Sequence, residues 1–337
     1  METGLIDMVE GLCGCSCKVS QEELEKLLDV SGIVEPRQHP TVLASIGEDA
    51  GIVSIDEKRA LVQSIDFLTP VTDDPYAQGW IAVNNACNDL FAKGVVNITG
   101  VLTVLGLPKS RLSVGEEILR GMADYVQEAG SIIIGGHTIY NPWPITGAAV
   151  AGVADKDRIV YNSTARPGDV VILTKPLGIQ PTITAYQELR HQEGIEDLKK
   201  LVCETMEKAI KVMRASSKPV AEVMQKIGVN ASTDVTGFGL HGHASEIARR
   251  SNVDIVIHTI PLLPGAEKLA ELFGYALREG KSAETAGGIL LSVDADKAES
   301  LLRALKNRDV RGFEIGSVTK GGGNVKITKD VKIIEAE

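Results

Sequence analysis

Apolar residues cluster in short runs separated by glycine-rich turns, which predicts a mixture of strands and helices along the chain. In the first half, two such runs flank the charged turn Asp56–Arg59 and predict a β-hairpin. The predicted elements of this half are strands at Gly51–Ile55, Ala60–Asp66, Ile98–Leu105, Ser131–Ile134 and Ala148–Val153, and a helix opened by the capping-box pattern Ser113 to Glu116. The tetrapeptide Gly135–Thr138 predicts a turn at the end of its strand.

The clearest helix signal runs from Pro75 to Lys93. Asp74 precedes it as a candidate N-cap, and Gly94 follows it as a natural stop. Its apolar positions fall on one stripe, which should face the core: Trp80, Val83, Cys87, Leu90 and Phe91. Cys87 is therefore predicted to be a buried core thiol. Asn85 and Asp89 share the opposite face, where a solvated polar surface is the simplest expectation.

A second block begins after the cluster Asn162–Gly168, which marks the best domain boundary. Its predicted elements are strands at Asp169–Leu173, Val229–Asp234, Val253–His258 and Gly288–Val293, and helices within Glu196–Ile227, broken near Pro219. The chain finishes in a hairpin-like tail that turns at Gly321–Gly323. The expected organisation is an N-terminal segment at 1–20 and two mixed α/β domains at 21–164 and 165–337, which is an α+β fold without a fixed-period repeat.

Composition narrows the function classes. The chain has 337 residues, 44% of them hydrophobic, and 34 glycines, which suits a globular protein of two domains. A net charge of −10 argues against nucleic acid as a partner, because phosphate backbones demand clustered Lys and Arg. The N-terminus lacks the features of a signal peptide, and no apolar run approaches membrane-spanning length. We therefore expect a cytoplasmic protein that has no membrane partner.

Three of the five cysteines lie within five residues, at Cys13, Cys15 and Cys17, and Lys18 follows at once. Thiols packed this densely beside glycine favour reactivity over core packing. The lysine is a candidate activator, since a nearby ammonium stabilises a thiolate and lowers its pKa. A zinc site is a weaker interpretation, because no second Cys or His pair lies at ligand spacing. A flexible, inert N-terminal tail is the other alternative.

Four carboxylates lie beside strand ends or glycine turns: Asp49, Asp66, Asp89 and Asp234. Hard cations such as Mg²⁺ prefer oxygen ligands, so acids in these places can hold the metal of a nucleotide polyphosphate. Asp is also common in turns for local hydrogen-bonding reasons, and each residue alone is better explained in that way.

The glycine motifs exclude two classes of nucleotide site. No P-loop pattern exists, which removes that class of kinases and ATPases. The segment Gly237–Gly242 matches GxGxxG literally, but the following strand opens with Asp254 and has no acid at its far end. These glycines are interpreted as a turn that feeds a helix beginning near His243, a position compatible with a nearby phosphate.

Taken together, seven motifs resemble selenophosphate synthetase (selenide, water dikinase), a family of the aminoimidazole ribonucleotide synthetase-like (PurM-like) superfamily. They are Gly14–Lys18, Glu48–Ala50, Ser64–Phe67, Asn85–Ala92, Gly135–Thr138, Leu173–Gly178 and Ser232–Leu240. The acidic motifs indicate the superfamily, whereas Gly14-Cys15-Ser16-Cys17-Lys18 matches the family's pattern of Gly, Cys or selenocysteine, two residues and Lys. Cys13 lies outside that pattern.

The resemblance implies a flexible, glycine- and cysteine-containing N-terminal segment, two PurM-like domains, and catalytic roles for Cys15 and Lys18. It implies conversion of ATP, selenide and water to selenophosphate, AMP and phosphate, with Mg²⁺ and usually a monovalent cation such as K⁺. The selenium source would be selenide or a selenium-delivery protein. It places the metal at Asp49, Asp66, Asp89 and Asp234 and the nucleotide near Lys18, Gly47, Glu48, Asp66, Asn85 and Asp89. Gly135, Gly136, His137 and Thr138 would join that site from the second subunit of a homodimer.

Three rival interpretations stay open. Another enzyme of the superfamily, such as aminoimidazole ribonucleotide synthetase or thiamine monophosphate kinase, would share the acids but has no reason for the Cys/Lys segment. A hydrogenase-maturation relative would carry its cysteine at the extreme C-terminus, where this chain ends Ile334-Glu335-Ala336-Glu337. A non-catalytic thiol protein that binds selenium or a metal would leave the scattered acids unexplained.

Overall fold

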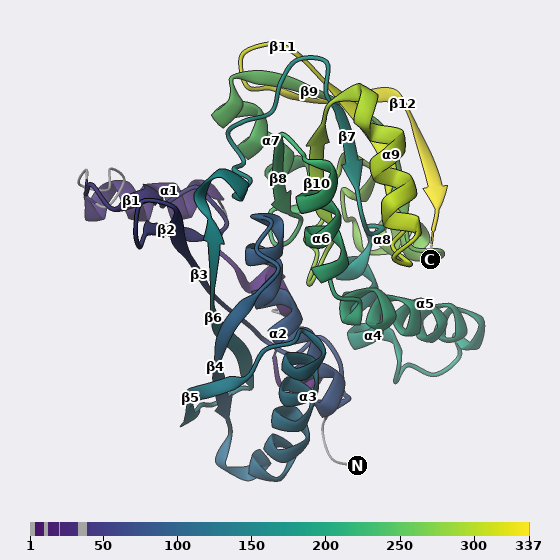
Figure 1. The fold of residues 1–337 in the computed structure, drawn as a ribbon. Helices are drawn as coiled ribbons and strands as arrows, with labels where there is room; N and C mark the ends of the chain where they lie inside the picture. The colour runs from purple at the N-terminus through teal and green to yellow at the C-terminus, as the bar shows by residue number, and fades with distance from the viewer. Residues whose placement is uncertain (1–3, 10–12, 20, 33–38, 337) are drawn as a thin grey trace.

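The computed structural model describes residues 4–9, 13–19, 21–32 and 39–336. Two six-stranded sheets, one in each half of the chain, form its framework (Figure 1). The first sheet has the order β1-β2-β3-β6-β4-β5 and is antiparallel except where β4 pairs with β5. Its half of the chain comprises α1 (Gln21–Ser31), β1 (Val42–Ala44), β2 (Gly51–Ser54), β3 (Arg59–Leu68), α2 (Pro75–Ala92), β4 (Ile98–Leu107), α3 (Gly115–Glu128), β5 (Ile133–Tyr140) and β6 (Ile145–Asp155). Helix α1 and strand β1 lie outside the elements predicted from the sequence.

The second sheet has the order β12-β9-β11-β7-β10-β8 and mixes parallel and antiparallel pairs. This half comprises β7 (Val170–Leu173), α4 (Ile179–Leu189), α5 (Glu196–Arg214), α6 (Lys218–Ile227), β8 (Ala231–Asp234), α7 (Gly239–Ser251), β9 (Val253–Leu262), α8 (Ala266–Phe273), β10 (Ile289–Val293), α9 (Ala295–Lys306), β11 (Phe313–Lys320) and β12 (Val325–Glu335). Short 3₁₀ turns lie at Ile6–Met8, Gly14–Cys17, Lys109–Val114, Lys156–Arg158 and Leu277–Glu279.

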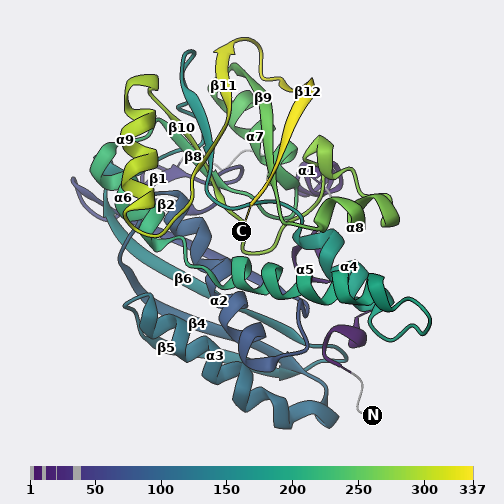
Figure 2. The ribbon, with the colours of Figure 1, turned by 90° about the vertical axis from the view of Figure 1, so that its right-hand side faces the viewer.

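Helix α2 lies between the two halves (Figure 2). It packs on β3 and β6 of the first sheet, and it also contacts α5, α6, β8 and β10 of the second half. Its predicted bounds and cap are confirmed: Asp74 accepts hydrogen bonds from two backbone N–H groups of the first turn, and Cys87 is buried in the first domain's core. Because both sides of α2 are covered, it can connect the sheet of one half to the strand ends of the other.

The largest apolar cluster spans both halves of the chain. It contains Ile6 and Cys15 from the N-terminal segment, Ile81 from α2, and strand residues of the second half such as Ile255. Burial of apolar side chains contributes about 25 cal/mol per Å², so this shared core holds the two halves and the described N-terminal residues together. Among the described residues, no helix is both long and apolar enough to span a membrane.

Two local predictions are wrong because strand pairing overrides them. Gly135–Thr138 form no turn; they continue β5, which pairs in parallel with β4. A side chain at Gly136 would collide with Thr103 of β4, so the glycine permits the close approach of the two strands. The capping box at Ser113 is also absent, since α3 begins at Gly115 after a 3₁₀ turn and has no side-chain cap.

The C-terminal tail is likewise no hairpin. β11 and β12 are joined at Gly321–Gly323, but β9 lies between them, antiparallel to β11 and parallel to β12. The carboxylate of Asp254, near the start of β9, accepts hydrogen bonds from the backbone N–H groups of Gly322 (3.0 Å) and Asn324 (2.9 Å). The connecting turn is thereby held over the end of β9, and the two strands pair with β9 on its opposite edges.

Candidate active site

A cavity of about 470 Å³ lies where the first sheet, α2 and the strand ends of the second half meet. It combines three kinds of lining. The acidic residues are Glu48, Asp49, Asp66, Asp89, Asp234 and Glu246; the basic or imidazole residues are Lys18, His243, Arg249 and Arg250; the apolar residues are Leu24, Leu28, Ile46, Ile65 and Phe238. A lining that is both charged and apolar suits a ligand that carries both a polyphosphate and a flat base.

The four predicted aspartates all line this cavity, although they come from distant parts of the chain. Asp49 precedes β2, Asp66 belongs to β3, Asp89 belongs to α2, and Asp234 ends β8. Burial raises the pKa of Asp89 well above its usual range, and the nearby charges of Asp234 and Asp66 raise it further. Burial also raises the pKa of Asp234 to about 6, with Asp49 adding to the effect. The fold therefore concentrates negative charge that a bound cation would stabilise.

Whether these acids fit Mg²⁺ can be tested on the geometry. Within the described residues, no three His, Cys, Asp or Glu side chains converge on one ion position. Mg²⁺ usually takes only one or two carboxylates from a protein, and phosphate oxygens and water complete its octahedron. The clustering of these carboxylates, in which neighbouring acids raise the pKa of Asp89 and of Asp234, is consistent with that requirement. The donor set fits Mg²⁺ bound together with a nucleotide rather than alone.

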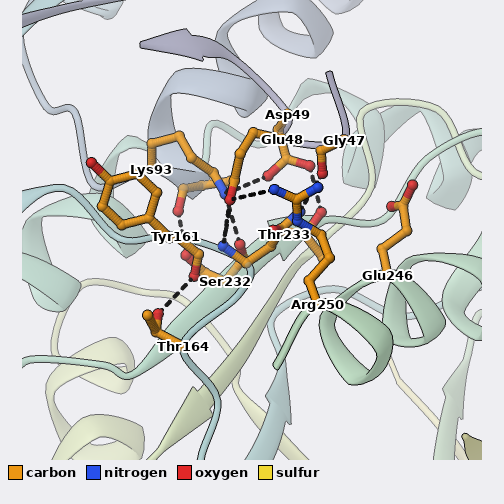
Figure 3. A network of polar contacts seen from close by, with 12 residues as sticks. Gly47, Glu48, Asp49, Lys93, Tyr161, Thr164, Ser232, Thr233, Glu246 and Arg250 are labelled. Carbon is orange, nitrogen blue, oxygen red and sulfur yellow. Dashed lines mark hydrogen bonds and ion pairs between the residues drawn. The ribbon is translucent and has the colours of Figure 1, made fainter. Parts of the chain in front are cut away.

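One wall of the cavity is a buried ion network around Lys93, drawn in Figure 3. Its ammonium group lies 2.8 Å from Glu48 Oε2 and 2.8 Å from Asp49 Oδ2, and it donates a hydrogen bond to the Ser232 carbonyl at 2.9 Å. Burial opposes the charge of Lys93, but Asp49 and Glu48 raise the pKa of its ammonium group above the ordinary value. The network ties the loop that carries Glu48 and Asp49 to α2 and to β8.

The neighbouring loop residue Gly47 is shaped by Arg250. Gly47 has a φ of +92°, and a side chain there would collide with the guanidinium group of Arg250, as their positions in Figure 3 illustrate. That guanidinium lies 3.8 Å from Glu48 Oε1, and Asn162 Nδ2 donates to the Gly47 carbonyl at 2.8 Å. The predicted Gly47–Glu48 segment thus has a defined place in the lining of the cavity.

Cys15 and Lys18 reach the same region from the N-terminal segment. The Lys18 ammonium lies 3.3 Å from Asp66 Oδ2 at the cavity, while Cys15 is 1% exposed beneath it. Burial raises the pKa of the Cys15 thiol to about 12, because it outweighs the lowering effect of Lys18. The prediction that Lys18 gives Cys15 a lowered pKa is therefore wrong for this docked conformation. Burial opposes the charge of Lys18 itself, but Cys15 and Asp66 raise the pKa of its ammonium group.

The described part of the N-terminal segment is fastened by residues at the C-terminal end of α4. Gln187 donates a hydrogen bond to the Ile6 carbonyl at 3.0 Å and accepts one from the Cys13 thiol at 3.2 Å. Arg190 pairs with Asp7 at 2.5 Å. The segment is therefore docked rather than extended into solvent, and Cys13, outside the resembling motif, has a contact that holds it in place.

The expectation of a solvated face at Asn85 is wrong. Asn85 is fully buried, and its side-chain amide donates to Asp66 while its carbonyl oxygen faces Cys15 Sγ at 3.5 Å. The second half of the chain covers this face of α2, so the helical pattern alone misplaces it. By contrast, Gly135–Thr138 do not reach the cavity of their own chain; they lie on the exposed edge strand β5.

Sequence reasoning missed several residues of the cavity, among them His243 and Glu246. The His243 Nδ1 atom lies 3.1 Å from Glu246 Oε2, and this carboxylate raises the pKa of the imidazole although burial opposes it. Both belong to the first turns of α7, directly after the Ser232–Leu240 motif, so their position in the sequence was the available signal.

Models of known families match both halves of the chain. The N-terminal domain model described as AIR synthase related protein matches residues 47–154, and the corresponding C-terminal domain model matches residues 166–328. These matches cover most of the chain and confirm the predicted pair of mixed α/β, PurM-like domains.

Curated relatives narrow the family. A selenide, water dikinase of Methanococcus maripaludis is 39% identical over 334 residues, which cover 96% of this chain and 99% of the relative. A selenide, water dikinase of Methanocaldococcus jannaschii is 40% identical over 341 residues, covering 96% and 95%. The chain belongs to the selenide, water dikinase family. The resemblance drawn from the sequence motifs is thereby confirmed.

Among solved structures, the chain is similar to a thiamine monophosphate kinase from Aquifex aeolicus. The TM-score is 0.66 at 22% identity, and the match covers 94% of this chain and 100% of the other. At this identity the likeness concerns the fold alone.

Proposed function

We propose that this protein synthesises selenophosphate from selenide, ATP and water, releasing AMP and phosphate. The observation that carries the proposal is the docking of Cys15 and Lys18 against a cavity lined by four aspartates. A superfamily kinase without selenium chemistry would need the acids but not the cysteine. A thiol protein without catalysis would need the cysteine but not the acids. Membership in the selenide, water dikinase family supports the reading in which both act together.

The proposed roles follow from charge and position. Four carboxylates would bind the Mg²⁺ ion of Mg²⁺-ATP: those of Asp49, Asp66, Asp89 and Asp234. The bound ion would screen the negative charge of the triphosphate. The Lys18 ammonium, already beside Asp66, stabilises charge on the transferred phosphoryl group. A monovalent cation such as K⁺ is a further part of this proposal.

Cys15 is proposed as the selenium carrier or nucleophile. Its burial at 1% exposure means that selenide, or a selenium-delivery protein, gains access when the segment undocks. Docking then removes the reacting atoms from bulk water. All five cysteines are free thiols, which suits the reducing cytoplasm that we propose as the protein's location.

The deciding experiment measures AMP, ADP and phosphate formed from ATP and Mg²⁺ under anaerobic conditions, with and without selenide. Selenide-stimulated AMP with equimolar phosphate is the expected result. ADP as the end product, or AMP formation that ignores selenide, would assign the protein to another ATP-dependent reaction of the superfamily.

Asp89→Asn is expected to stabilise the free protein and to weaken Mg²⁺-ATP binding by about tenfold or more. Folding raises the pKa of the buried Asp89 carboxyl, so the stability of the folded protein falls as the pH rises from the unfolded pKa to the folded pKa. An uncharged amide at this position avoids that loss of stability at pH 7. Thermal unfolding and nucleotide titration measure the two effects. Asp296→Asn, on the exposed face of α9, is the control. Unchanged affinity would remove Asp89 from the binding site.

We further propose that the protein is a homodimer joined through the face of the first sheet that lies opposite α2 and α3, called its helix-free face with respect to the described residues. Figure 1 shows α2 and α3 on the other face only. Ile65, Leu102 and Ile134 line a shallow depression of about 440 Å³ on the helix-free face and are 61%, 44% and 64% exposed. An apolar surface of this kind on a sheet marks an interface. Strand β5 lies on the same sheet, which supports a contribution of Gly135–Thr138 to the second subunit's site.

A double variant, Leu102→Asp with Ile134→Asp, is expected to be monomeric, because it places charges in the proposed interface. Sedimentation velocity measures the change. Leu272→Asp, an exposed apolar residue on α8, is the control and should leave the association state unchanged. A wild-type protein that sediments as a monomer at micromolar concentration would contradict the proposal.

A further inference from the structure

The segment Glu284–Gly287, called the strap here, lies between the 3₁₀ turn at Leu277–Glu279 and β10 and contacts several parts of the site. The hydroxyl oxygen of Thr285 accepts a hydrogen bond from the Cys15 backbone N–H at 3.0 Å. Thr285 is 1% exposed, so no water replaces this bond. The strap is thus a direct contact between the second half of the chain and the backbone of the proposed selenium-carrying residue.

The strap also sets the direction of the Asn85 side chain. The backbone N–H of Ala286 donates to Asn85 Oδ1 at 2.7 Å. Because an N–H group can only donate, the oxygen of this amide must face Ala286, and the NH₂ group must then face Asp66. The same oxygen lies 3.5 Å from Cys15 Sγ. One strap residue therefore orients an amide between the thiol and a carboxylate of the cavity.

Several features hold the strap in an unusual conformation. Ala286 has a φ of +46°, which a residue with a β-carbon rarely adopts unless its surroundings impose it. Its carbonyl accepts a hydrogen bond at 2.7 Å from the buried ammonium group of Lys175. The Glu284 carboxyl accepts the backbone N–H groups of Gly178 and Ile179 at 2.8 and 2.9 Å, at the start of α4. The strap is accordingly anchored on both sides of Thr285.

Close packing leaves the N-terminal segment little freedom on the strap. Gly14 has a φ of +60°, and a β-carbon there would lie 2.5 Å from Thr285 Oγ1 and 2.6 Å from Val71 Cγ1. On the other side, a β-carbon at Gly287 would collide with the Val235 carbonyl, directly after Asp234. Because the contacts at Gly14 and Gly287 are this close, they fix the position of the N-terminal segment and of the strap.

We propose that Thr285 is a positioning residue for Cys15, and that the strap places the thiol over the acidic cavity. This proposal rests on the proposed function and deepens it. The hydroxyl of Thr285 holds the backbone of Cys15, while the Ala286 N–H fixes the Asn85 amide that faces its sulfur. Thr285 acts through Cys15, whose backbone and thiol its hydroxyl contacts, and Ala286 acts through Asn85.

Labelling of Cys15 tests the proposal independently of turnover. Wild-type protein is treated with iodoacetamide, and the label on Cys15 is quantified over time by mass spectrometry of the N-terminal peptide. Thr285→Val keeps the side-chain shape but removes the acceptor, so the segment should undock and Cys15 should be labelled about tenfold faster. Thr285→Ser retains a hydroxyl and should restore the wild-type rate. Gly14→Ala should also accelerate labelling, because its methyl group displaces the segment from Thr285.

Steady-state kinetics provide a second test of the positioning role of Thr285. In Thr285→Val, kcat for selenide-dependent AMP formation should fall about ten- to hundredfold, while the Mg²⁺-ATP affinity stays within about twofold. Thr205→Val is the control, since Thr205 is 1% exposed and donates its hydroxyl to the Leu201 carbonyl at 2.8 Å within α5. It should lose comparable thermal stability without a change in labelling or kcat.

The outcomes separate the two proposals. If wild-type protein is labelled slowly and Thr285→Val and Gly14→Ala are labelled fast, the strap positions Cys15, whether or not selenide stimulates AMP formation. If wild-type turnover responds to selenide but Thr285→Val retains wild-type labelling and kcat, Thr285 has no positioning role and this inference is overturned.

Discussion

Cys15→Ser is expected to lower selenide-dependent AMP formation by at least about a hundredfold, while Mg²⁺-ATP affinity stays within about twofold of wild type. The hydroxyl is a far weaker nucleophile than a thiolate, and it binds selenium poorly. Its smaller size leaves the buried position otherwise intact, and Asn85 can still accept a hydrogen bond there. AMP release under anaerobic conditions and nucleotide titration measure the two quantities.

Cys203→Ser supplies the matched control for this experiment, because Cys203 is an exposed thiol on α5 that does not line the cavity. It should retain full activity. A Cys15→Ser protein with wild-type turnover would exclude Cys15 as the selenium carrier or nucleophile. Cys13 and Cys17 would then be the remaining candidates in the N-terminal segment.

Lys93→Met is expected to lower the free energy of unfolding by about 3–5 kcal/mol. The substitution removes the ammonium group from a buried network, so Asp49 loses its ion pair at 2.8 Å and Glu48 is left with the more distant guanidinium of Arg250 at 3.8 Å. The loop that carries these acids forms part of the cavity, so Mg²⁺-ATP binding should weaken as well. Urea denaturation at pH 7 measures the change in stability, because a loss of this size in the free energy of unfolding clearly lowers the urea concentration at the midpoint of unfolding.

Two further variants make the Lys93 result interpretable. Adding Glu48→Gln to Lys93→Met should recover part of the lost stability, because one buried charge becomes neutral. Arg120→Met removes a pair with Glu117 in which both side chains are largely exposed, so it should cost no more than about 1 kcal/mol. A Lys93→Met protein that loses as little as Arg120→Met would show that the network contributes little to folding.

Local signals were sufficient for most elements. The cap at Asp74 and the stop at Gly94 bound α2 because both act within one turn of the helix. The break between α5 and α6 falls near Pro219 as predicted, since a proline ring suits the first turn of a new helix. The burial of Cys87 followed from the same periodicity.

Predictions from the sequence were wrong where a segment distant in the chain determines the local structure. Asn85 lies on the polar face of α2, and a helix pattern cannot reveal that the strap covers this face. Strand β5 extends through Gly135–Thr138 because β4 offers hydrogen-bond partners, although the glycines favour a turn in isolation. In the tail, β9 separates two strands that are neighbours in sequence.

The sequence by itself determined the local elements, the two-domain organisation and the Cys15/Lys18 motif with its family. Each depends on residues a few positions apart or on the order of motifs along the chain. Only the tertiary structure decided that Cys15 is buried with a raised pKa, that Lys93 pairs with Glu48 and Asp49, and that Thr285 holds the Cys15 backbone. These features join residues from about 45 to 270 positions apart, and burial and charge at such sites are set by the packing of whole domains.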